Sequence, residues 1–204
     1  MSKKKPLIVF EGIEGTGKTL HINNIAKFFK KKGIEYIKIR EPGGSKNSES
    51  IRKIILNKKS NFNKLTDLFL YLAARNENKE EIIHKNYKKK IILIDRFTDS
   101  TLAYQHYGMG INKKLIILLN KTILKKIKPD FTFLYTINRK NLLNRLRKRV
   151  NKNRYDKFKY EFYNKVQKGF INLSKNKKKY LIIDSNNEIA ENKKIILNKI
   201  KKII

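Results

Sequence analysis

Cysteine and tryptophan are absent from this sequence of 204 residues, which also contains only three prolines. Without cysteine, disulfides and thiolate metal sites are excluded, and an intracellular protein is the natural expectation. No apolar stretch approaches the length of a membrane-spanning helix. The basic N-terminus is followed by an apolar run of only about five residues, which is too short for a signal peptide. We therefore expect a soluble protein of the cytoplasm that has no membrane partner.

Acidic residues are also scarce, since 17 Asp and Glu stand against 50 Lys and Arg, for a formal net charge of +33. A charge of this size suggests a nucleic-acid partner. However, the basic residues comprise 41 lysines and only nine arginines, and the lysines are scattered along the whole chain rather than interleaved with aromatic residues. Lys, Ile and Asn all have A/T-rich codons and together make up 94 residues. We therefore expect no specific nucleic-acid partner.

Five apolar runs of strand length alternate with longer stretches of helical spacing. The runs are nearly continuous rather than alternating, which is typical of strands whose two faces are both covered by helices. The order predicts an α/β fold with a five-stranded parallel sheet flanked by helices, as a single domain over residues 1–204. The predicted strands are Leu7–Glu11, Tyr36–Arg40, Ile91–Asp95, Phe131–Thr136 and Tyr180–Asp184. The predicted helices are Lys18–Lys32, Ser48–Asn57, Leu65–Asn86, Lys113–Ile127, Lys140–Arg149, Lys157–Asn176 and Glu188–Ile204.

The segment GIEGTGKT at residues 12–19 fits the pattern G-x-x-x-x-G-K-[ST], and it lies between a predicted strand and a predicted helix. Such a loop points its backbone N–H groups at phosphates, and the helix N-terminus adds partial positive charge. Lys18 would reach the β- and γ-phosphates, and Thr19 would bind Mg²⁺. A glycine-rich turn with a chance Lys-Thr pair is the alternative. The residues predicted to bind ATP are Gly12, Ile13, Glu14, Gly15, Thr16, Gly17, Lys18 and Thr19.

Two further predicted strands end in charged residues. Arg40 begins the segment REPGG, and Asp95 and Arg96 end the segment IILIDR. Because ligands of α/β folds bind outside the carboxyl ends of the strands, both arginines could meet a phosphate, and Asp95 could order a water on Mg²⁺. An arginine exposed before a turn is the alternative reading for Arg40.

Two other segments could recognise a base. Tyr71 and Arg75 are four residues apart in a predicted helix and share a face, so the ring could stack on a base and the guanidinium could bind its carbonyl. A core tyrosine beside a surface arginine fits the spacing equally well. The run from Ser100 to Gln105 offers several hydrogen-bonding side chains that could read a base and a sugar.

Taken together and in order, these segments resemble the thymidylate kinase family. The matching segments are Glu11 through Thr19, REPGG from Arg40, AAR ending at Arg75, DR at residues 95–96, and S-x-x-A-Y-Q at residues 100–105. The loop at residues 12–19 alone would indicate only a large superfamily. REPGG and DR-x-x-x-S-x-x-A-Y-Q at these separations are far more specific. The resemblance covers most of the chain and weakens after residue 136.

The resemblance implies a P-loop kinase fold with a small mobile lid over about residues 145–159. It implies ATP as the phosphoryl donor, dTMP as the acceptor and Mg²⁺ as the cofactor, held by Thr19 and Asp95. Arg40 and Arg96 would hold the acceptor phosphate, and Glu14 would accept the sugar 3′-hydroxyl.

The family resemblance also implies how the rest of dTMP is bound. Tyr71 would stack on thymine at a position where phenylalanine is usual, and Arg75 would bind the base carbonyl. Ser100 and Gln105 would help to read the base, while Tyr104 would pack beside the sugar and disfavour a ribose 2′-hydroxyl.

Family members differ in where their catalytic arginine lies. This loop has Gly15 and Thr16 where some members carry it, whereas five of the nine arginines fall between residues 139 and 154. The chain therefore resembles the members that supply the arginine from a lid, and residues 148–159 are polar enough to predict an exposed, mobile segment. We expect Arg147 and Arg149 to act on the transferred phosphoryl group, together with Lys18 and Arg96. For Arg145 and Arg154, a contact with adenine or within the lid is the alternative.

The resemblance predicts a thymidylate kinase that converts dTMP to dTDP with ATP, and a homodimer. Because the acceptor phosphate is already ionised near neutral pH, no general base is needed. One alternative is another P-loop kinase that acts on a different nucleoside monophosphate or on a deoxynucleoside. A basic nucleic-acid-binding protein with a residual nucleotide site is the alternative from another class.

Overall fold

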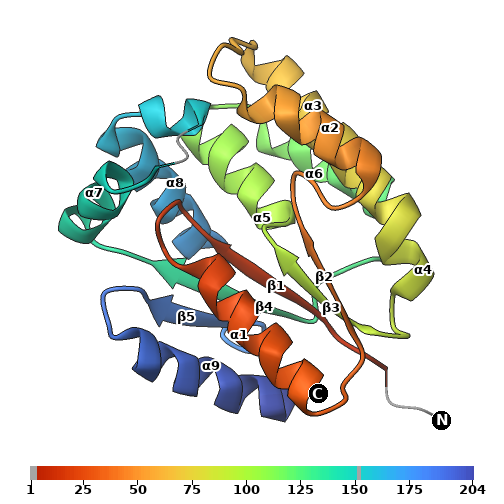
Figure 1. Cartoon of the computed structure of the whole chain (residues 1–204). Helices are drawn as coiled ribbons and strands as arrows, with labels where there is room; N and C mark the ends of the chain where they lie inside the picture. The colour runs from red at the N-terminus through yellow and green to blue at the C-terminus, as the bar shows by residue number, and fades with distance from the viewer. Residues whose placement is uncertain (1–3, 151–152) are drawn as a thin grey trace.

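A five-stranded sheet forms the centre of the computed structural model, which describes residues 4–150 and 153–204 (Figure 1). Every neighbouring pair of strands is parallel, and the order across the sheet is β2-β3-β1-β4-β5. The five-stranded parallel sheet is confirmed, and only the end of the first strand differs from its predicted bounds, by one residue. The strands are β1 (Leu7–Gly12), β2 (Tyr36–Arg40), β3 (Ile91–Asp95), β4 (Phe131–Thr136) and β5 (Tyr180–Asp184).

The central strand β1 is buried on both of its faces, which explains its continuous apolar run. Ile8 and Phe10 belong to a core that includes residues of α1 (Lys18–Lys31) and α9 (Ile189–Ile203). These two helices cover the near face of the sheet in Figure 1. Leu7 and Val9 point to the opposite face and pack in a core with the end of α6 (Lys113–Leu124). The helix α8 (Tyr160–Leu173) contacts β1 and β4.

The helices begin and end within three residues of their predicted bounds, but the helical pattern differs from the prediction in two respects. The predicted helix over residues 65–86 is α3 (Lys64–Asn78), a π-helical turn η1 (Lys79–Ile83) and α4 (His84–Asn86). The other helices are α2 (Lys46–Leu56), α7 (Arg139–Arg147) and the short 3₁₀ turn η3 (Arg154–Lys157). Three helical elements were not predicted: α5 (Thr98–Thr101), the π-helical η2 (Leu102–Gly108) and the turn η3. Across residues 4–150 and 153–204, no helix is both long and apolar enough to span a bilayer.

The unpredicted element η2 packs closely on α8, and small residues make this possible. A Cβ atom on Gly169 would lie 2.6 Å from the ring of Tyr107, and one on Gly108 would lie 2.7 Å from the ring of Phe162. Backbones that approach so closely leave no room for side chains at these two positions. The position of η2 therefore depends on a contact with a helix about 60 residues later, which local periodicity does not reveal.

The prediction of an exposed segment at residues 148–159 is wrong for part of it. Tyr155 is only 3% exposed, and its backbone carbonyl accepts a hydrogen bond from the Tyr163 hydroxyl at 2.7 Å. The side chain of Asn153 accepts from the Tyr155 N–H, and Asp156 accepts from the Asn153 N–H, which together form a capping box. These contacts order the turn and bury its aromatic residue. Residues 151–152 of this segment lie outside the described residues.

Candidate active site

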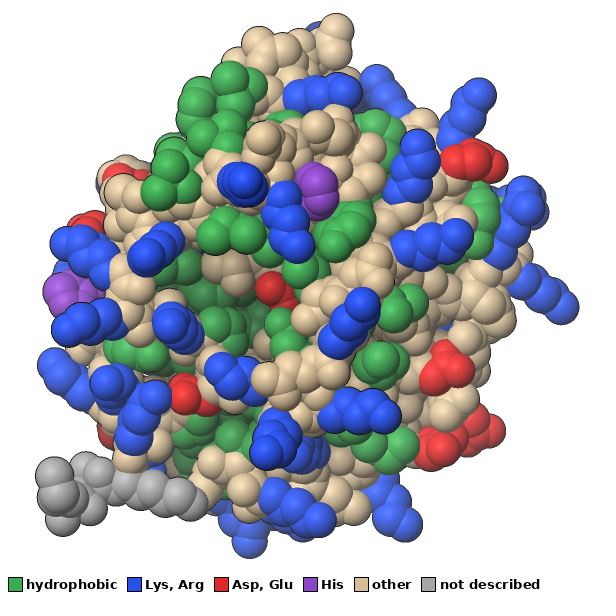
Figure 2. Space-filling model, turned by 180° about the vertical axis from the view of Figure 1, so that it is seen from behind, with side chains coloured by type: hydrophobic (Ala, Val, Ile, Leu, Met, Phe, Trp, Pro, Cys, Tyr) green, Lys and Arg blue, Asp and Glu red, His purple; other side chains and the backbone are tan. Residues whose placement is uncertain are grey.

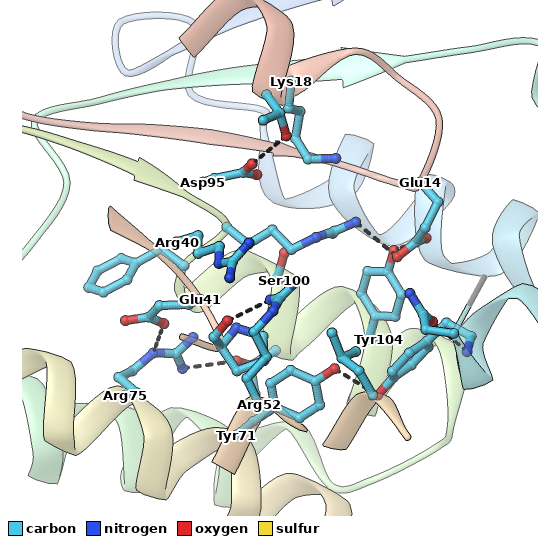
Figure 3. Close-up of a pocket in the computed structure, with 18 of the residues that line it drawn as sticks. Glu14, Lys18, Arg40, Glu41, Arg52, Tyr71, Arg75, Asp95, Ser100 and Tyr104 are labelled. Carbon is cyan, nitrogen blue, oxygen red and sulfur yellow. Dashed lines mark hydrogen bonds and ion pairs between the residues drawn. The ribbon is translucent and has the colours of Figure 1, made fainter. Parts of the chain in front are cut away.

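The carboxyl ends of β1, β2 and β3 meet at one edge of the sheet, where there is a cavity of about 250 Å³ (Figure 3). Asp95 at the end of β3 is in register with Phe10 of β1 and with Arg40 of β2. The predicted site residues that line the cavity are Glu14, Gly15, Lys18, Thr19, Arg40, Tyr71, Arg75, Asp95, Arg96, Ser100, Tyr104, Gln105 and Arg149. Those that are not in its lining are Gly12, Ile13, Thr16, Gly17 and Arg147.

The loop at residues 12–19 has the backbone geometry of a phosphate-binding loop. Gly12 has a φ of 137°, and a Cβ there would lie 2.4 Å from the carbonyl oxygen of Tyr135. Gly17 has a φ of 81° and precedes α1, which no side chain caps at this end. The N–H groups of the first turn of α1 therefore face the loop and suit an anion. The Thr16 hydroxyl donates to the Ile13 carbonyl at 2.8 Å and closes the loop.

Lys18 folds back onto this loop. Its side chain is buried, and Nζ donates to the carbonyl oxygens of Gly12 and Ile13, both at 2.8 Å. Burial, with the positive charge of Arg96, lowers the pKa of Lys18 to about 8, although nearby carboxylates oppose the shift. The ammonium is thus desolvated without a full negative charge in contact, and phosphate oxygens would be stronger partners than carbonyls.

Thr19 and Asp95, the predicted Mg²⁺ residues, are brought together by α1 and β3. The Thr19 hydroxyl donates to Asp95 Oδ2 at 2.9 Å, although 76 positions separate them in the sequence. Among residues 4–150 and 153–204, no group of three or more His, Asp or Glu side chains could hold a metal ion. Mg²⁺ commonly binds one or two protein oxygens and completes its shell with substrate phosphates and water. A hydroxyl and a carboxylate beside a phosphate-binding loop fit that requirement.

Arg96 follows β3 in a left-handed backbone conformation with a φ of 67°, which is unusual for a residue other than glycine. Its backbone N–H donates to the carbonyl of Phe10 at 3.0 Å, which anchors the turn to β1. The guanidinium donates to Glu14 at 3.0 Å and to the Ser100 hydroxyl at 3.3 Å, and it lies 5.1 Å from the ring centre of Tyr104. The side chain is therefore held in one orientation toward the phosphate-binding loop.

Glu14 is the carboxylate at the centre of this arrangement. It accepts hydrogen bonds from Arg96 and from the Tyr104 hydroxyl, the latter at 2.5 Å. Burial alone would raise the pKa of Glu14, but the charges of Arg96 and Lys18 outweigh it and hold that pKa below its usual value. Glu14 is therefore ionised near neutral pH and can accept a hydrogen bond from a hydroxyl group of a ligand.

Glu11 holds the turn that carries Arg96, and it was not predicted as a site residue. Its buried carboxylate accepts from the N–H groups of Phe97 at 2.8 Å and Ser100 at 3.1 Å, and from the Ser100 hydroxyl at 2.5 Å. Burial, with the nearby carboxylate of Asp99, raises the pKa of Glu11 to about 7. Its position within the motif FEG, just before the loop, gave no sign of these contacts.

The residues predicted to read a base form the far wall of the cavity. Tyr71, Tyr104 and Gln105 line it together, and Gln105 is fully buried. The alternative of a surface Arg75 is wrong, because this side chain is only 2% exposed. Arg75 donates from Nε to Glu41 at 2.7 Å, and from Nη1 to Thr101 and Asn120 (Figure 3). These bonds fix the plane of its guanidinium at the floor of the cavity.

Two arginines reach the cavity from β2 and α2. Arg40 makes a bidentate ion pair with Glu49, at 2.9 and 3.1 Å, and its side chain is half exposed. Arg52 donates to the Pro42 carbonyl at 2.6 Å and also lines the cavity, although sequence analysis did not single it out. The scarcity of arginine could have identified it, since all four arginines before residue 139 line this cavity.

The arginines after residue 139 divide into different roles. Arg149 lines the cavity and donates to Asp156 at 2.9 Å, whereas Arg147 is exposed at the end of α7. Arg145 donates to the carbonyls of Gly15 and Ser185, at 2.8 and 2.7 Å, and so holds α7 beside the phosphate-binding loop. Arg154 makes a buried ion pair with Asp67 of α3. Only Arg149 of these four reaches the cavity.

Comparisons with known proteins identify the family of this chain. The family model described as Thymidylate kinase matches residues 10–196. The chain belongs to the thymidylate kinase family. It is 38% identical to the thymidylate kinase of Sulfurihydrogenibium sp. (strain YO3AOP1) over 95% of this chain and 96% of that protein. For the thymidylate kinase of Thermosipho africanus, the identity is 37% over 93% and 96% of the two chains.

A solved structure extends the comparison to the fold. The thymidylate kinase from Ehrlichia chaffeensis superposes with a TM-score of 0.79 at 30% identity, over 97% of this chain and 99% of that chain. The predicted family and the predicted P-loop kinase fold are therefore confirmed, and the chain is an ATP-using kinase of nucleotide biosynthesis.

Proposed function

We propose that this chain transfers the γ-phosphoryl group of ATP to dTMP, giving dTDP and ADP in the synthesis of dTTP. One observation supports this most strongly. A single cavity contains Lys18 of the phosphate-binding loop, Arg96 at the end of β3, and the aromatic wall formed by Tyr71 and Tyr104. A site for a triphosphate, a second cation for an acceptor phosphate and a surface for a base therefore lie within reach of each other.

The donor side is formed by the loop and by Arg149. Backbone N–H groups at residues 12–19 would surround the β-phosphate, and Lys18 would exchange its two carbonyl partners for phosphate oxygens. Arg149, held by Asp156 and lining the cavity, would neutralise charge on the transferred group. Because the loop has Gly15 and Thr16 where an arginine would otherwise lie, we assign this chain to the type that supplies its arginine from the lid.

We further propose that Thr19 and Asp95 hold Mg²⁺ together with ATP. Bound there, Mg²⁺ would offset the negative charge of the ATP phosphates. The hydrogen bond of 2.9 Å between Thr19 and Asp95 keeps their oxygens on the same side of the loop, next to Lys18.

The acceptor side is formed around Arg96. Arg96 and Arg40 would hold the dTMP phosphate, and Arg40 would release Glu49 to do so. Glu14 would accept the 3′-hydroxyl, and the ring of Tyr104, bonded to Glu14, would occupy the space that a 2′-hydroxyl needs.

The base would lie on the ring of Tyr71, with Arg75, Ser100 and Gln105 around its edge. Because the acceptor phosphate is already ionised, catalysis would rest on in-line positioning and charge neutralisation rather than on a general base.

We also propose a homodimer formed through α3 and α6, which contact each other. The outer surfaces of these helices expose large hydrophobic side chains. Leu118, for example, is 60% exposed. Hydrophobic side chains gather at the upper left of the face seen in Figure 2, where these helices lie. Burying such side chains against a second copy would stabilise a dimer. The exposed hydrophobic residues of the two helices are Leu65, Phe69, Leu115, Ile117 and Leu118.

Since the chain has no cysteine, we place it in the cytoplasm.

Acceptor profiling tests the proposed reaction. ADP release is measured with Mg-ATP and one acceptor at a time, from dTMP, dUMP, dCMP, dGMP, AMP, UMP and thymidine. The proposal predicts a kcat/KM for dTMP well above all the others. Fast turnover of another acceptor would keep the kinase but overturn the assignments of Tyr71, Arg75 and Tyr104. Silence with all acceptors, with tight and salt-dependent duplex DNA binding, would favour the nucleic-acid alternative. The Lys and Arg side chains seen in Figure 2 are spread over that whole face rather than gathered in one patch.

A further inference from the structure

Asp67 of α3 is a buried carboxylate that joins the base wall of the cavity to the turn at residues 153–158. Its side chain is only 2% exposed. Oδ2 accepts hydrogen bonds from the Tyr155 hydroxyl at 3.1 Å and from Gln105 Nε2 at 3.4 Å, and the ion pair with Arg154 completes its surroundings. Burying a carboxylate costs free energy unless hydrogen-bond donors surround it. Asp67 therefore favours the arrangement in which Tyr155, Gln105 and Arg154 all contact it.

Two of these donors belong to the proposed acceptor site. Tyr155 and Gln105 both line the cavity. The Tyr155 hydroxyl accepts a hydrogen bond from the Tyr71 hydroxyl at 2.8 Å while it donates to Asp67. The ring of Tyr155 also meets the rings of Tyr71 and Tyr104 edge-on, at 6.4 and 5.8 Å between centroids. Since Tyr71 donates to an oxygen that Asp67 holds in place, the orientation of the Tyr71 ring depends on Asp67.

The same turn also holds the proposed catalytic arginine. Asp156, the residue after Tyr155, accepts from Arg149 through Oδ1 at 2.9 Å and from the Asn153 N–H through Oδ2 at 2.6 Å. The Asn153 side chain in turn accepts from the Tyr155 N–H at 2.8 Å. A displacement of Tyr155 would therefore move the carboxylate that orients Arg149.

We propose that Asp67 is a positioning residue that couples recognition of the acceptor base to the placement of Arg149, with Tyr155 as the connecting side chain. Asp67 touches no reacting atom; it acts through Tyr155 on the ring of Tyr71 and through η3 on Arg149. A base seated on Tyr71 would favour the arrangement in which Arg149 points into the cavity. This inference rests on the proposed function and adds two residues, Asp67 and Tyr155, that sequence analysis did not identify as part of the site.

Tyr155→Phe tests the coupling most cleanly, because it keeps the ring in the cavity and removes only the connecting hydroxyl. We expect the KM for dTMP to rise by about five- to tenfold and kcat to fall by a similar factor, because the variant loses the hydrogen bonds of this hydroxyl with Tyr71, Asp67 and Arg154. The KM for ATP should stay within about twofold of the wild type. Tyr87→Phe is the matched control, because the Tyr87 hydroxyl bonds only the backbone of Lys128 on the surface. It should leave all three constants unchanged.

A double variant tests the link to Arg149. Arg149→Lys should reduce kcat by a smaller factor in the Tyr155→Phe background than in the wild type, because the turn no longer fixes the arginine. Equal factors in the two backgrounds would overturn the proposal. Wild-type kinetic constants for Tyr155→Phe would also overturn it. If the Tm fell while the constants stayed the same, the hydroxyl would contribute to stability alone. Asp67→Asn should reproduce the kinetic pattern of Tyr155→Phe, and if it does not fold, the Tyr155→Phe result decides alone.

The wild-type rate with dTMP separates this inference from the proposed function. If the wild type does not phosphorylate dTMP, the proposed function fails and the positioning role falls with it. If the wild type is active and Tyr155→Phe behaves like the wild type, only the positioning role is overturned.

Discussion

The guanidinium of Arg96 lies 3.0 Å from the Glu14 carboxylate, although 82 positions separate the two residues. Each side chain is partly buried, and each helps to compensate the charge of the other. Because the left-handed turn after β3 fixes Arg96 and the phosphate-binding loop fixes Glu14, the pair connects the proposed donor and acceptor halves of the cavity.

Replacing Arg96 should therefore affect the acceptor far more than the donor. We expect Arg96→Lys to lower kcat/KM for dTMP by about 100-fold or more, since it loses the planar contacts with Glu14 and Ser100 and leaves Glu14 poorly compensated. The affinity for ATP, measured by calorimetry, should change little. Arg139→Lys, at an arginine that stacks on Tyr160 outside the cavity, is the matched control and should be near wild type. Normal dTMP kinetics for Arg96→Lys would rule out its assignment to the acceptor phosphate.

Arg149 and Arg147 are two residues apart, but only Arg149 lines the cavity. We expect Arg149→Lys to reduce kcat by about 10³-fold, as for the loss of an arginine that neutralises the transferred phosphoryl group. Arg147→Lys should cost less than about tenfold, because its side chain is exposed. Steady-state kinetics of the two variants at saturating substrates measure this directly. The reverse order would show that α7 rearranges so that Arg147 replaces Arg149 during turnover.

The lowered pKa of Lys18 predicts how ATP binding depends on pH. In the free protein this pKa is about 8, and a bound triphosphate would raise it again, because negative charge favours the ammonium form. Binding above pH 8 must then take up a proton, and the Kd for ATP should rise by up to about tenfold per pH unit. Calorimetry at pH 9 in two buffers of different ionisation enthalpy detects the uptake.

Lys18→Arg provides the control for this titration. Arginine keeps its charge at pH 9, so proton uptake should disappear in this variant. Proton uptake of the same size in Lys18→Arg and in the wild type would assign the effect to another group near the loop. The charged groups that influence Lys18 are Glu11, Glu14, Asp95 and Arg96.

The raised pKa of Glu11 predicts how stability depends on pH. The folded protein keeps this proton up to about pH 7, whereas the unfolded chain releases it near 4.5. Between these values the folded state binds more protons, so the contribution of Glu11 to stability falls as pH rises through this window. The difference in free energy of unfolding between wild type and Glu11→Gln should fall by about 3 kcal/mol from pH 4.5 to pH 7. Urea unfolding at several pH values measures it. A difference that stays constant with pH would mean that Glu11 has the same pKa in the folded and unfolded states.

Most of the fold could be predicted because helices cover both faces of the sheet, so that each strand is a nearly continuous apolar run. The element η2 could not, since it depends on Gly108 and Gly169 allowing a close contact with α8. The exposed segment was mispredicted for the same kind of reason. Arg154 and Tyr155 look like polar and solvent-facing residues until Asp67, almost 90 positions earlier, is placed beside them.

The site was predictable where a residue has to lie at a strand end or in the loop. Thr19 and Asp95 meet as expected, because parallel strands and the loop end at the same edge of the sheet. Arg52 and Tyr155 come from a helix and a turn, and only packing brings them to the cavity. The choice between Arg147 and Arg149 could not be made from sequence, because it depends on where α7 ends and on the bond from Arg149 to Asp156.

The most direct test of phosphoryl transfer to dTMP is the identity of the product. Wild-type protein is incubated with Mg-ATP and dTMP, and phosphorus NMR follows every phosphate. We expect dTDP and ADP to form in equal amounts and inorganic phosphate to stay near background. ADP formed together with inorganic phosphate, without dTDP, would contradict it and would leave an ATPase that does not use dTMP.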